Sequence, residues 1–183
     1  NITMTVPGIT LSQVGSFTIT NTADISLITT TTQIKNAGGE AFTPLQVKVA
    51  GAGGTGVPGL PVTFTVSDPQ LGVFAGSNCQ QLLGPGFNQN GTTTTLTVNT
   101  DSSGVASAAN FCSGTLLGNY VVTATTTIGG VSKSKQIPLA NTAQFSNTVT
   151  GNNQTAVANG GVFSPLGVTV IGYNNNPVPN VQV

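Results

Sequence analysis

The chain has 183 residues, with four cationic and four acidic side chains and no histidine, so its formal net charge is zero. Charged residues make up 4% of the sequence, against about 25% in a typical soluble protein, and such a surface has nothing to attract nucleic acid or anionic lipid. The absence of histidine excludes catalysis by a Ser–His or Cys–His pair. No run approaches the length of a membrane span.

Regular alternation of apolar and polar residues predicts strands along most of the chain. In chain order these are residues 45–49, 61–66, 93–99 and 120–124, with a further short strand at 71–74. The pattern places Val62, Phe64 and Val66 on one face of their strand. No segment has helical periodicity with capping signals. We therefore predict an all-β fold of the sandwich type with almost no helix.

A turn is predicted at residues 101–104 (DSSG), between the strand signals at 93–100 and 105–111. Asp101 can accept hydrogen bonds from backbone amides that follow it, and Gly104 tolerates a positive φ. We expect this turn to close a β-hairpin. A calcium loop needs several oxygen ligands, and because only one carboxylate lies here, we predict no metal site.

The long segment 67–92 contains the most irregular sequence, and a loop of this kind is expected either to have a function or to be tied down. Cys79 lies in it, and Cys112 follows 33 residues later. In an exported protein this pair predicts one disulfide, and in a cytosolic protein two buried thiols. The uncharged surface favours the disulfide, which would fasten the loop.

The chain begins to repeat itself two thirds of the way along. Three segments return, namely NTA at 21–23 as NTA at 141–143 (141 − 21 = 120), FTPL at 42–45 as FSPL at 163–166 (163 − 42 = 121), and VPGLPV at 57–62 as VPNVQV at 178–183. A repeat this long is a whole domain. We therefore predict the C-terminal strands of a preceding module at 1–20, a complete module at 21–140, and the N-terminal strands of a following module at 141–183.

Several segments, taken in order, resemble the bacterial immunoglobulin-like modules of the invasin and intimin type. They are FTPLQVKV at 42–49, GLPVTF at 59–64, GVF at 72–74, TDSSGVA at 100–106 and GNYVVTA at 118–124, with FSPLGVTV at 163–170 and NPVPNVQV at 176–183 in the second copy. The resemblance covers nearly the whole chain. It implies immunoglobulin-like β-sandwich modules in tandem on a secreted or surface-anchored bacterial protein, where such arrays serve as stalks or fibres.

The candidate sites of enzyme chemistry all have a simpler structural explanation. The run GAGGTG at 51–56 matches a dinucleotide-binding pattern, but two prolines and a strand follow it where that site needs a helix. The carboxylates form no evident acid–base pair; they are Asp24, Glu40, Asp68 and Asp101. We predict no cofactor, no metal and no enzymatic activity.

Two further kinds of site remain as candidates. Asn90 and Asn153 lie in N-x-T sequons, as does Asn1, and can be glycosylated only in a host that has this modification. Tyr120 stands near the start of its strand and is expected to bond a backbone carbonyl, as in a tyrosine corner.

We weigh two functions for this sequence. The first is structural: a module array forming a stalk, fibre or filament outside the cell, whose partners are adjacent copies of the same module. The second is an adhesin module that binds surface glycans or a receptor through the loop 76–91, because loops on rigid sandwiches carry recognition. The loop contains Phe87 as its only aromatic residue, and sugar sites usually need stacking faces.

Overall fold

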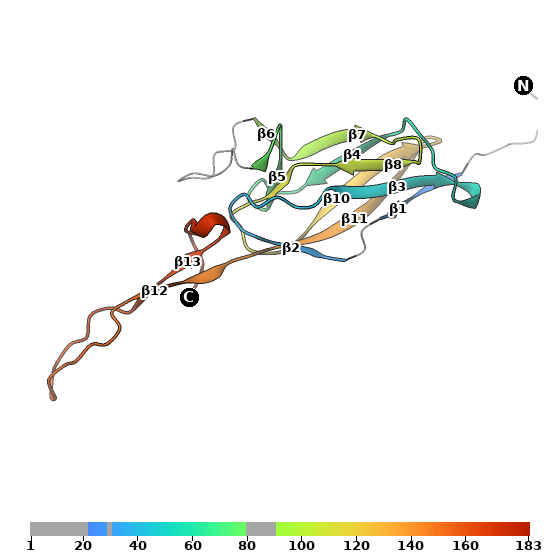
Figure 1. Cartoon of the computed structure of the whole chain (residues 1–183). Coiled ribbons are helices and arrows are strands. Elements are labelled where there is room, and N and C mark those ends of the chain that lie inside the picture. Colours follow the sequence, from blue (N-terminus) through green and yellow to red (C-terminus); the bar gives the residue numbers. More distant parts are fainter. Residues whose placement is uncertain (1–21, 29–30, 80–90) are drawn as a thin grey trace, which may run out of the picture.

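The computed structural model describes residues 22–28, 31–79 and 91–183 and consists mostly of β-strands (Figure 1). The helical elements that lie wholly within these ranges are two three-residue 3-10 turns, η1 (Ala52–Gly54) and η3 (Tyr173–Asn175). The prediction of an all-β protein with almost no helix is therefore confirmed.

The strands β1 to β11, which end at Thr142 and which we call the body, form three sheets within the described ranges. The first has the order β1 (Ala23–Leu27), β3 (Leu45–Gly51) and β8 (Val105–Ala108). The second has the order β2 (Gln33–Asn36), β11 (Val131–Thr142), β10 (Gly118–Ile128), β4 (Pro61–Val66) and β7 (Thr95–Asn99). The third has the order β6 (Thr92–Thr93), β5 (Gly72–Ala75) and β9 (Phe111–Ser113).

All three sheets contribute side chains to one hydrophobic core. Strand β3 buries every second residue from Leu45, and strand β4 buries Val62, Phe64 and Val66 as its alternation predicts. Phe74 and Phe111 of the third sheet join the same core, with ring centroids 4.8 Å apart. Burial of each of these large side chains stabilises the fold by about 1.5–3 kcal/mol.

The turn at residues 101–104 joins two sheets, and the expectation of a hairpin is wrong. Strand β7 before the turn pairs with β4, whereas β8 after it pairs with β3. The chain therefore crosses from the second sheet to the first at this turn. Local turn chemistry reverses the chain direction, but it does not decide which neighbours the two strands take.

The two longest strands, β10 and β11, pair with each other, and β11 leads out of the body. Strand β10 pairs along its whole length with β11 and so extends beyond the predicted 120–124 at both ends. Strand β2 lies parallel to the end of β11, with Asn36 opposite Thr142. After Ala143 alone, the chain continues into β12 (Gln144–Thr150).

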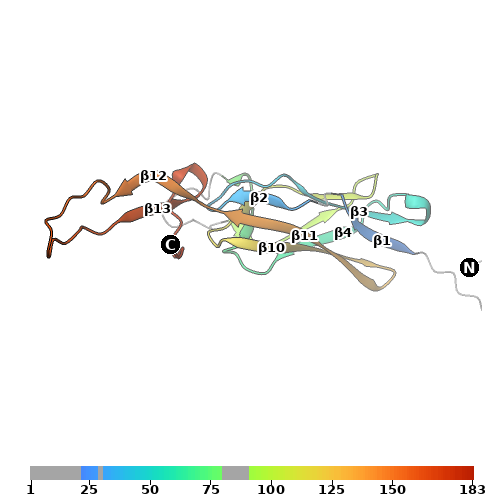
Figure 2. The same ribbon diagram turned by 90° about the horizontal axis from the view of Figure 1, so that it is seen from below.

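Strands β12 and β13 (Gly167–Ile171) form a hairpin that projects from the body, with residues 151–166 at its far tip (Figures 1 and 2). Its register repeats that of the first sheet at the two pairs nearest the body and then shifts, because Val149 lies opposite Val168 where the match to Leu27 and Val47 would place Asn147. Gln144 lies opposite Ile171, as Asp24 lies opposite Ala50. The repeat seen in the sequence is thus also a repeat of strand pairing, at offsets of 144 − 24 = 120 and 171 − 50 = 121.

Candidate functional site

The body and the projecting hairpin meet at a contact that we call the junction, between the turn at 36–40 and the loop at 172–178. Ala37 joins this contact to the end of β11. Its N–H donates to the carbonyl of Thr142 at 2.8 Å, and its carbonyl accepts from the N–H of Tyr173 at 2.8 Å. Ala37 is fully buried. The junction is therefore made by backbone groups, which must pair when they are taken out of water.

Close packing at the junction requires a glycine. A β-carbon built on Gly172 would lie 2.1 Å from the carbonyl oxygen of Ala37, a separation at which one of the two segments must move. Val178 of the same loop is buried as well, although most of the hairpin is exposed. The approach of the two segments thus depends on the missing side chain at 172.

The turn that carries Ala37 is held by β9. The hydroxyl of Ser113 donates to the carbonyl of Asn36 at 2.6 Å and accepts from the N–H of Glu40 at 2.9 Å. The carboxylate of Glu40 in turn accepts from the N–H of Asn36 at 2.6 Å and pairs with Lys35 at 3.1 Å. Because these bonds fix both ends of the turn, the carbonyl of Ala37 that accepts from Tyr173 is held in one position.

A disulfide lies next to this support. Cys79 and Cys112 are joined, as the sequence favoured, with their Cα atoms 5.5 Å apart. Both are buried against Val73. The bond fastens the start of the predicted ligand loop to β9, one residue before Ser113. The greater part of that loop, and with it the sequon at Asn90, lies outside the described residues.

Asn141 is a buried polar hub where β11 leaves the body. Its side-chain amide donates to the carbonyls of Leu71 at 2.7 Å and Leu116 at 2.9 Å, and its oxygen accepts from the hydroxyl of Tyr120 at 3.1 Å. Burial raises the pKa of Tyr120 far above its ordinary value, although the bond to Asn141 acts in the opposite direction. The expected bond from Tyr120 to a backbone carbonyl is therefore replaced by one to a side chain.

The loop of the junction has a counterpart in the body. In the hairpin, the N–H of Gly172 bonds the carbonyl of Asn176 at 2.8 Å, and in the body the N–H of Gly51 bonds the carbonyl of Thr55 at 2.8 Å. Each loop contains one 3-10 turn, η3 or η1. The glycine run at 51–56 is thus an inter-strand loop whose conformation recurs, although its sequence does not.

The turn at 101–104 has the local chemistry that its sequence indicates. One carboxylate oxygen of Asp101 accepts from the N–H groups of Ser103 and Val105, at 2.8 and 2.9 Å, and from the Ser103 hydroxyl at 2.7 Å. These bonds, that from the hydroxyl above all, lower the pKa of Asp101. Gly104 has a φ of 80°, and a β-carbon there would lie 2.3 Å from the carbonyl oxygen of Val49. The turn is structural.

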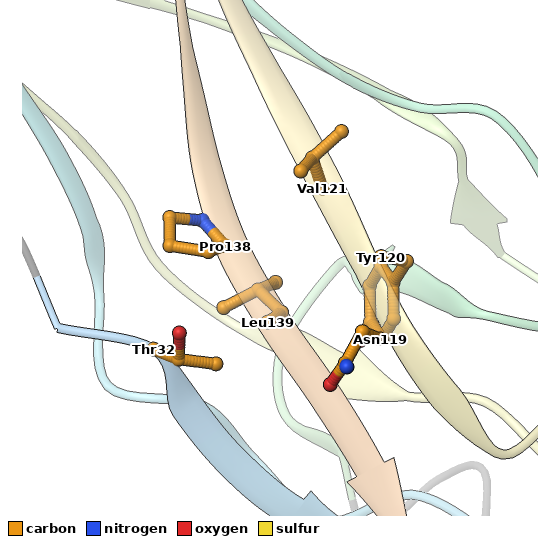
Figure 3. A pocket seen from close by; sticks show the side chains of 6 residues that line it. All are labelled: Thr32, Asn119, Tyr120, Val121, Pro138 and Leu139. Carbon is orange, nitrogen blue, oxygen red and sulfur yellow. The ribbon is translucent and has the colours of Figure 1, made fainter.

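The remaining candidates lie apart from one another. Asn153 is exposed in the segment between β12 and β13, where it has a φ of 54°. A surface hollow lies beside Tyr120 and is lined by residues of β10 and β11 together with Thr32 (Figure 3). No carboxylate, amine or thiol lines this hollow. Its polar side chains are those of Thr32, Asn119 and Tyr120.

Sequence reasoning did not single out Ala37, Ser113 or Gly172. Ala37 and Ser113 contribute through groups that many residues carry, so no motif marks them. Gly172 could have been found, because glycine recurs at the matched position 51 (172 − 51 = 121) in a loop whose other residues change.

Comparisons with protein families, with curated proteins and with solved structures give no match to this chain. In the described ranges, no three His, Cys, Asp or Glu side chains gather in a group that could hold a metal ion. None of the helical segments described is long and apolar enough to cross a membrane.

Proposed function

We propose that this chain is a segment of a tandem array of immunoglobulin-like β-sandwich modules, and that the array is a structural stalk or fibre of a secreted or surface bacterial protein. The observation that carries the proposal is the repeated strand pairing next to the body, where Gln144 and Phe145 of β12 lie opposite Ile171 and Val170 of β13 as Asp24 and Ile25 of β1 lie opposite Ala50 and Val49 of β3. The bacterial and immunoglobulin-like parts of the proposal rest on the resemblance of the sequence motifs.

The exposed face of the hairpin supports the same proposal. Apolar side chains that are exposed there match side chains that the body buries, with fractional exposures of 61% for Phe145 against 1% for Ile25, 60% for Phe163 against 5% for Phe42, and 79% for Leu166 against 0% for Leu45. Large apolar patches on soluble proteins mark surfaces that another surface covers, and all three of these exposed side chains lie on the hairpin. The matched strands of the body indicate what that cover is: the remaining strands of a second sandwich.

The junction supports a mechanical role. Strand β11 passes into β12 through Ala143 alone, and Ala37 accepts a backbone bond from Tyr173 across the junction. A linker of one residue, together with this bond and the buried Val178, leaves little freedom for one module to swing against the next. The disulfide fits an oxidising compartment.

The proposal is tested by completing the second module. Residues 63–140 are appended after Val183, which supplies the strands that the hairpin lacks. We expect Phe145, Phe163 and Leu166 to become buried, together stabilising the new module by roughly 5–9 kcal/mol. Binding of a hydrophobic dye should fall, and backbone amides of β13 should become protected from exchange.

The control carries the same appended residues in shuffled order, which should leave the hairpin face exposed. If the ordered extension protects β13 no better than the shuffled one, the hairpin is not the start of a second module. Native protein from the source then provides an independent check, because an array requires a polypeptide well above the 18.3 kDa of this chain.

A further inference from the structure

We propose that the loop around Gly51 is a docking surface for another copy of the same module, namely the turn at 36–40 of the module that precedes it in the array. This inference rests on the proposed tandem array and adds the place and chemistry of the contact. In it, the carbonyl of the preceding Ala37 accepts a hydrogen bond from the N–H of Ala52.

The junction at Gly172 shows what such a docked loop looks like. Its glycine is buried, the N–H of the next residue, Tyr173, donates to Ala37, and Val178 is buried. The equivalent residues in the body are Gly51, Ala52 and Val57. The two loops share their internal hydrogen bonds, including the bond from the N–H of Val178 to Val170 at 2.9 Å, which in the body runs from Val57 to Val49 at 3.0 Å.

The body's loop has the same shape without the contact. Gly51 and Val57 are only half-buried, and Ala52 is exposed. The N–H of Ala52 has no hydrogen-bond partner among the described residues. This donor is bonded in one copy of the loop and open to solvent in the other. The N–H of Ala52 is therefore available to an acceptor on another surface.

Glycine at position 51 has no local explanation within the described residues. Its φ of −84° is accessible to any amino acid. A β-carbon built there would have its nearest neighbour, the carbonyl oxygen of Thr22, at 3.7 Å, which is ordinary contact. At Gly172, by contrast, the carbonyl of Ala37 leaves no room for a side chain. The same approach by a preceding module explains the glycine at 51.

The partner turn is suited to this role because it is preformed. Ser113 and Glu40 hold the turn from within its own module, and the carbonyl of Ala37 accepts a donor from outside it. Docking therefore needs no rearrangement on the acceptor side, which lowers its entropic cost. Each module would thus carry an acceptor turn near one end and a donor loop near the other, a head-to-tail arrangement that propagates into a filament.

The test uses the full chain and a longer chain in which residues 21–140 occur twice in succession. Amide hydrogen exchange is measured by NMR with segmental labelling, so that the two units are distinguished. In the native chain, we expect the amide of Tyr173 to be protected and that of Ala52 to exchange freely. In the longer chain, Ala52 of the second unit should become protected by about tenfold or more, while Ala52 of the first unit stays unprotected.

Gly51→Val provides the matched variant, because the position tolerates a side chain in an undocked loop. Placed in the second unit, Gly51→Val should abolish the protection of Ala52 in that unit. Placed in the first unit, it should leave the protection of Ala52 in the second unit unchanged. Free exchange of Ala52 in a second unit that is itself folded would overturn the docking surface and leave the array intact. A second unit that fails to fold would overturn the array and the docking surface together. Protection that increases with protein concentration would place the contact between separate chains and overturn docking by a preceding module.

Discussion

Replacement of Asn141 by leucine should destabilise the fold far more than its modest side chain suggests. The amide of Asn141 is the donor to Leu116 and one of two donors to Leu71, whose carbonyl also accepts from the N–H of Gly114 at 2.9 Å. Asn141→Leu therefore leaves the carbonyl of Leu116 and the hydroxyl of Tyr120 unpaired, and Leu71 with one bond. The buried hydroxyl of Tyr120 costs about 1–3 kcal/mol when it is left unpaired, and each lost bond to Leu71 and Leu116 costs about 0.5–1.5 kcal/mol, so we expect a loss of roughly 2–6 kcal/mol.

The free energy of unfolding can be measured by urea denaturation followed by far-ultraviolet circular dichroism, since the chain has no tryptophan to report by fluorescence. Tyr120→Phe removes only the hydroxyl bond to Asn141 and should cost about 1 kcal/mol. Asn147→Leu makes the same chemical change at an exposed position of β12 and should stay within about 0.5 kcal/mol of the parent. A loss from Asn141→Leu no larger than that from Tyr120→Phe would refute the role of Asn141 as a hub.

Three further changes separate structural contributions elsewhere. Phe42→Ala should cost about 3–5 kcal/mol because its side chain is in the core, whereas Phe163→Ala at the matched exposed position should change the free energy of unfolding by less than about 0.5 kcal/mol. Replacing Cys79 and Cys112 together by alanine should cost about 3–4 kcal/mol, from the loop-closure entropy of a 33-residue separation. Asp101 has a lowered pKa when folded, so its stabilising bonds are present above its ordinary pKa of 3.8 and are lost as the pH falls through the folded pKa. Asp101→Ala should therefore lose less stability than the parent on acidification below about pH 4, as measured by thermal unfolding.

Each of these expectations can fail in a distinct way. Equal losses from Phe42→Ala and Phe163→Ala would mean that the hairpin already has a packed face. An unfolding midpoint unchanged by the cysteine replacements would show that the loop does not depend on its bond. A parallel acid response in Asp101→Ala and the parent would assign the acid sensitivity to the other carboxylates.

The parts of the fold that sequence predicts are those fixed within one short segment. The alternation at residues 61–66 fixes which face of β4 is buried, and the oxygen of Asp101 fixes its turn, because both depend on neighbours a few residues away. The choice of strand partners on either side of that turn does not depend on such near neighbours. It depends on how the sheets pack, and no residue within the turn carries that information.

The junction escaped prediction for a related reason. Ala37 contributes an N–H and a carbonyl, and it contributes them only because Ser113, far along the chain, holds its turn. The polar hub was closer to detection, since the triplet that contains Asn141 recurs in the sequence at 21–23. A recurrent residue is visible in a sequence, whereas a backbone carbonyl held in one position is not.

Comparison of the two loops shows what this repeat conserves physically. Gly53 and Gly59 have φ values of 69° and 75°, and their counterparts Asn174 and Asn180 have 53° and 60°. Among residues with a side chain, asparagine best tolerates this left-handed region. The exchange of Gly for Asn therefore keeps the backbone conformation although the residue type changes. Position 172 is different, because the carbonyl of Ala37 leaves no room for a side chain there. Its counterpart in the body, position 51, is also glycine. A position where Gly and Asn exchange at positive φ thus indicates a conformational requirement, whereas glycine that recurs at an ordinary negative φ, as at 51 and 172, indicates a contact. By this criterion Gly51 is the residue of the body at which a neighbouring module should be sought.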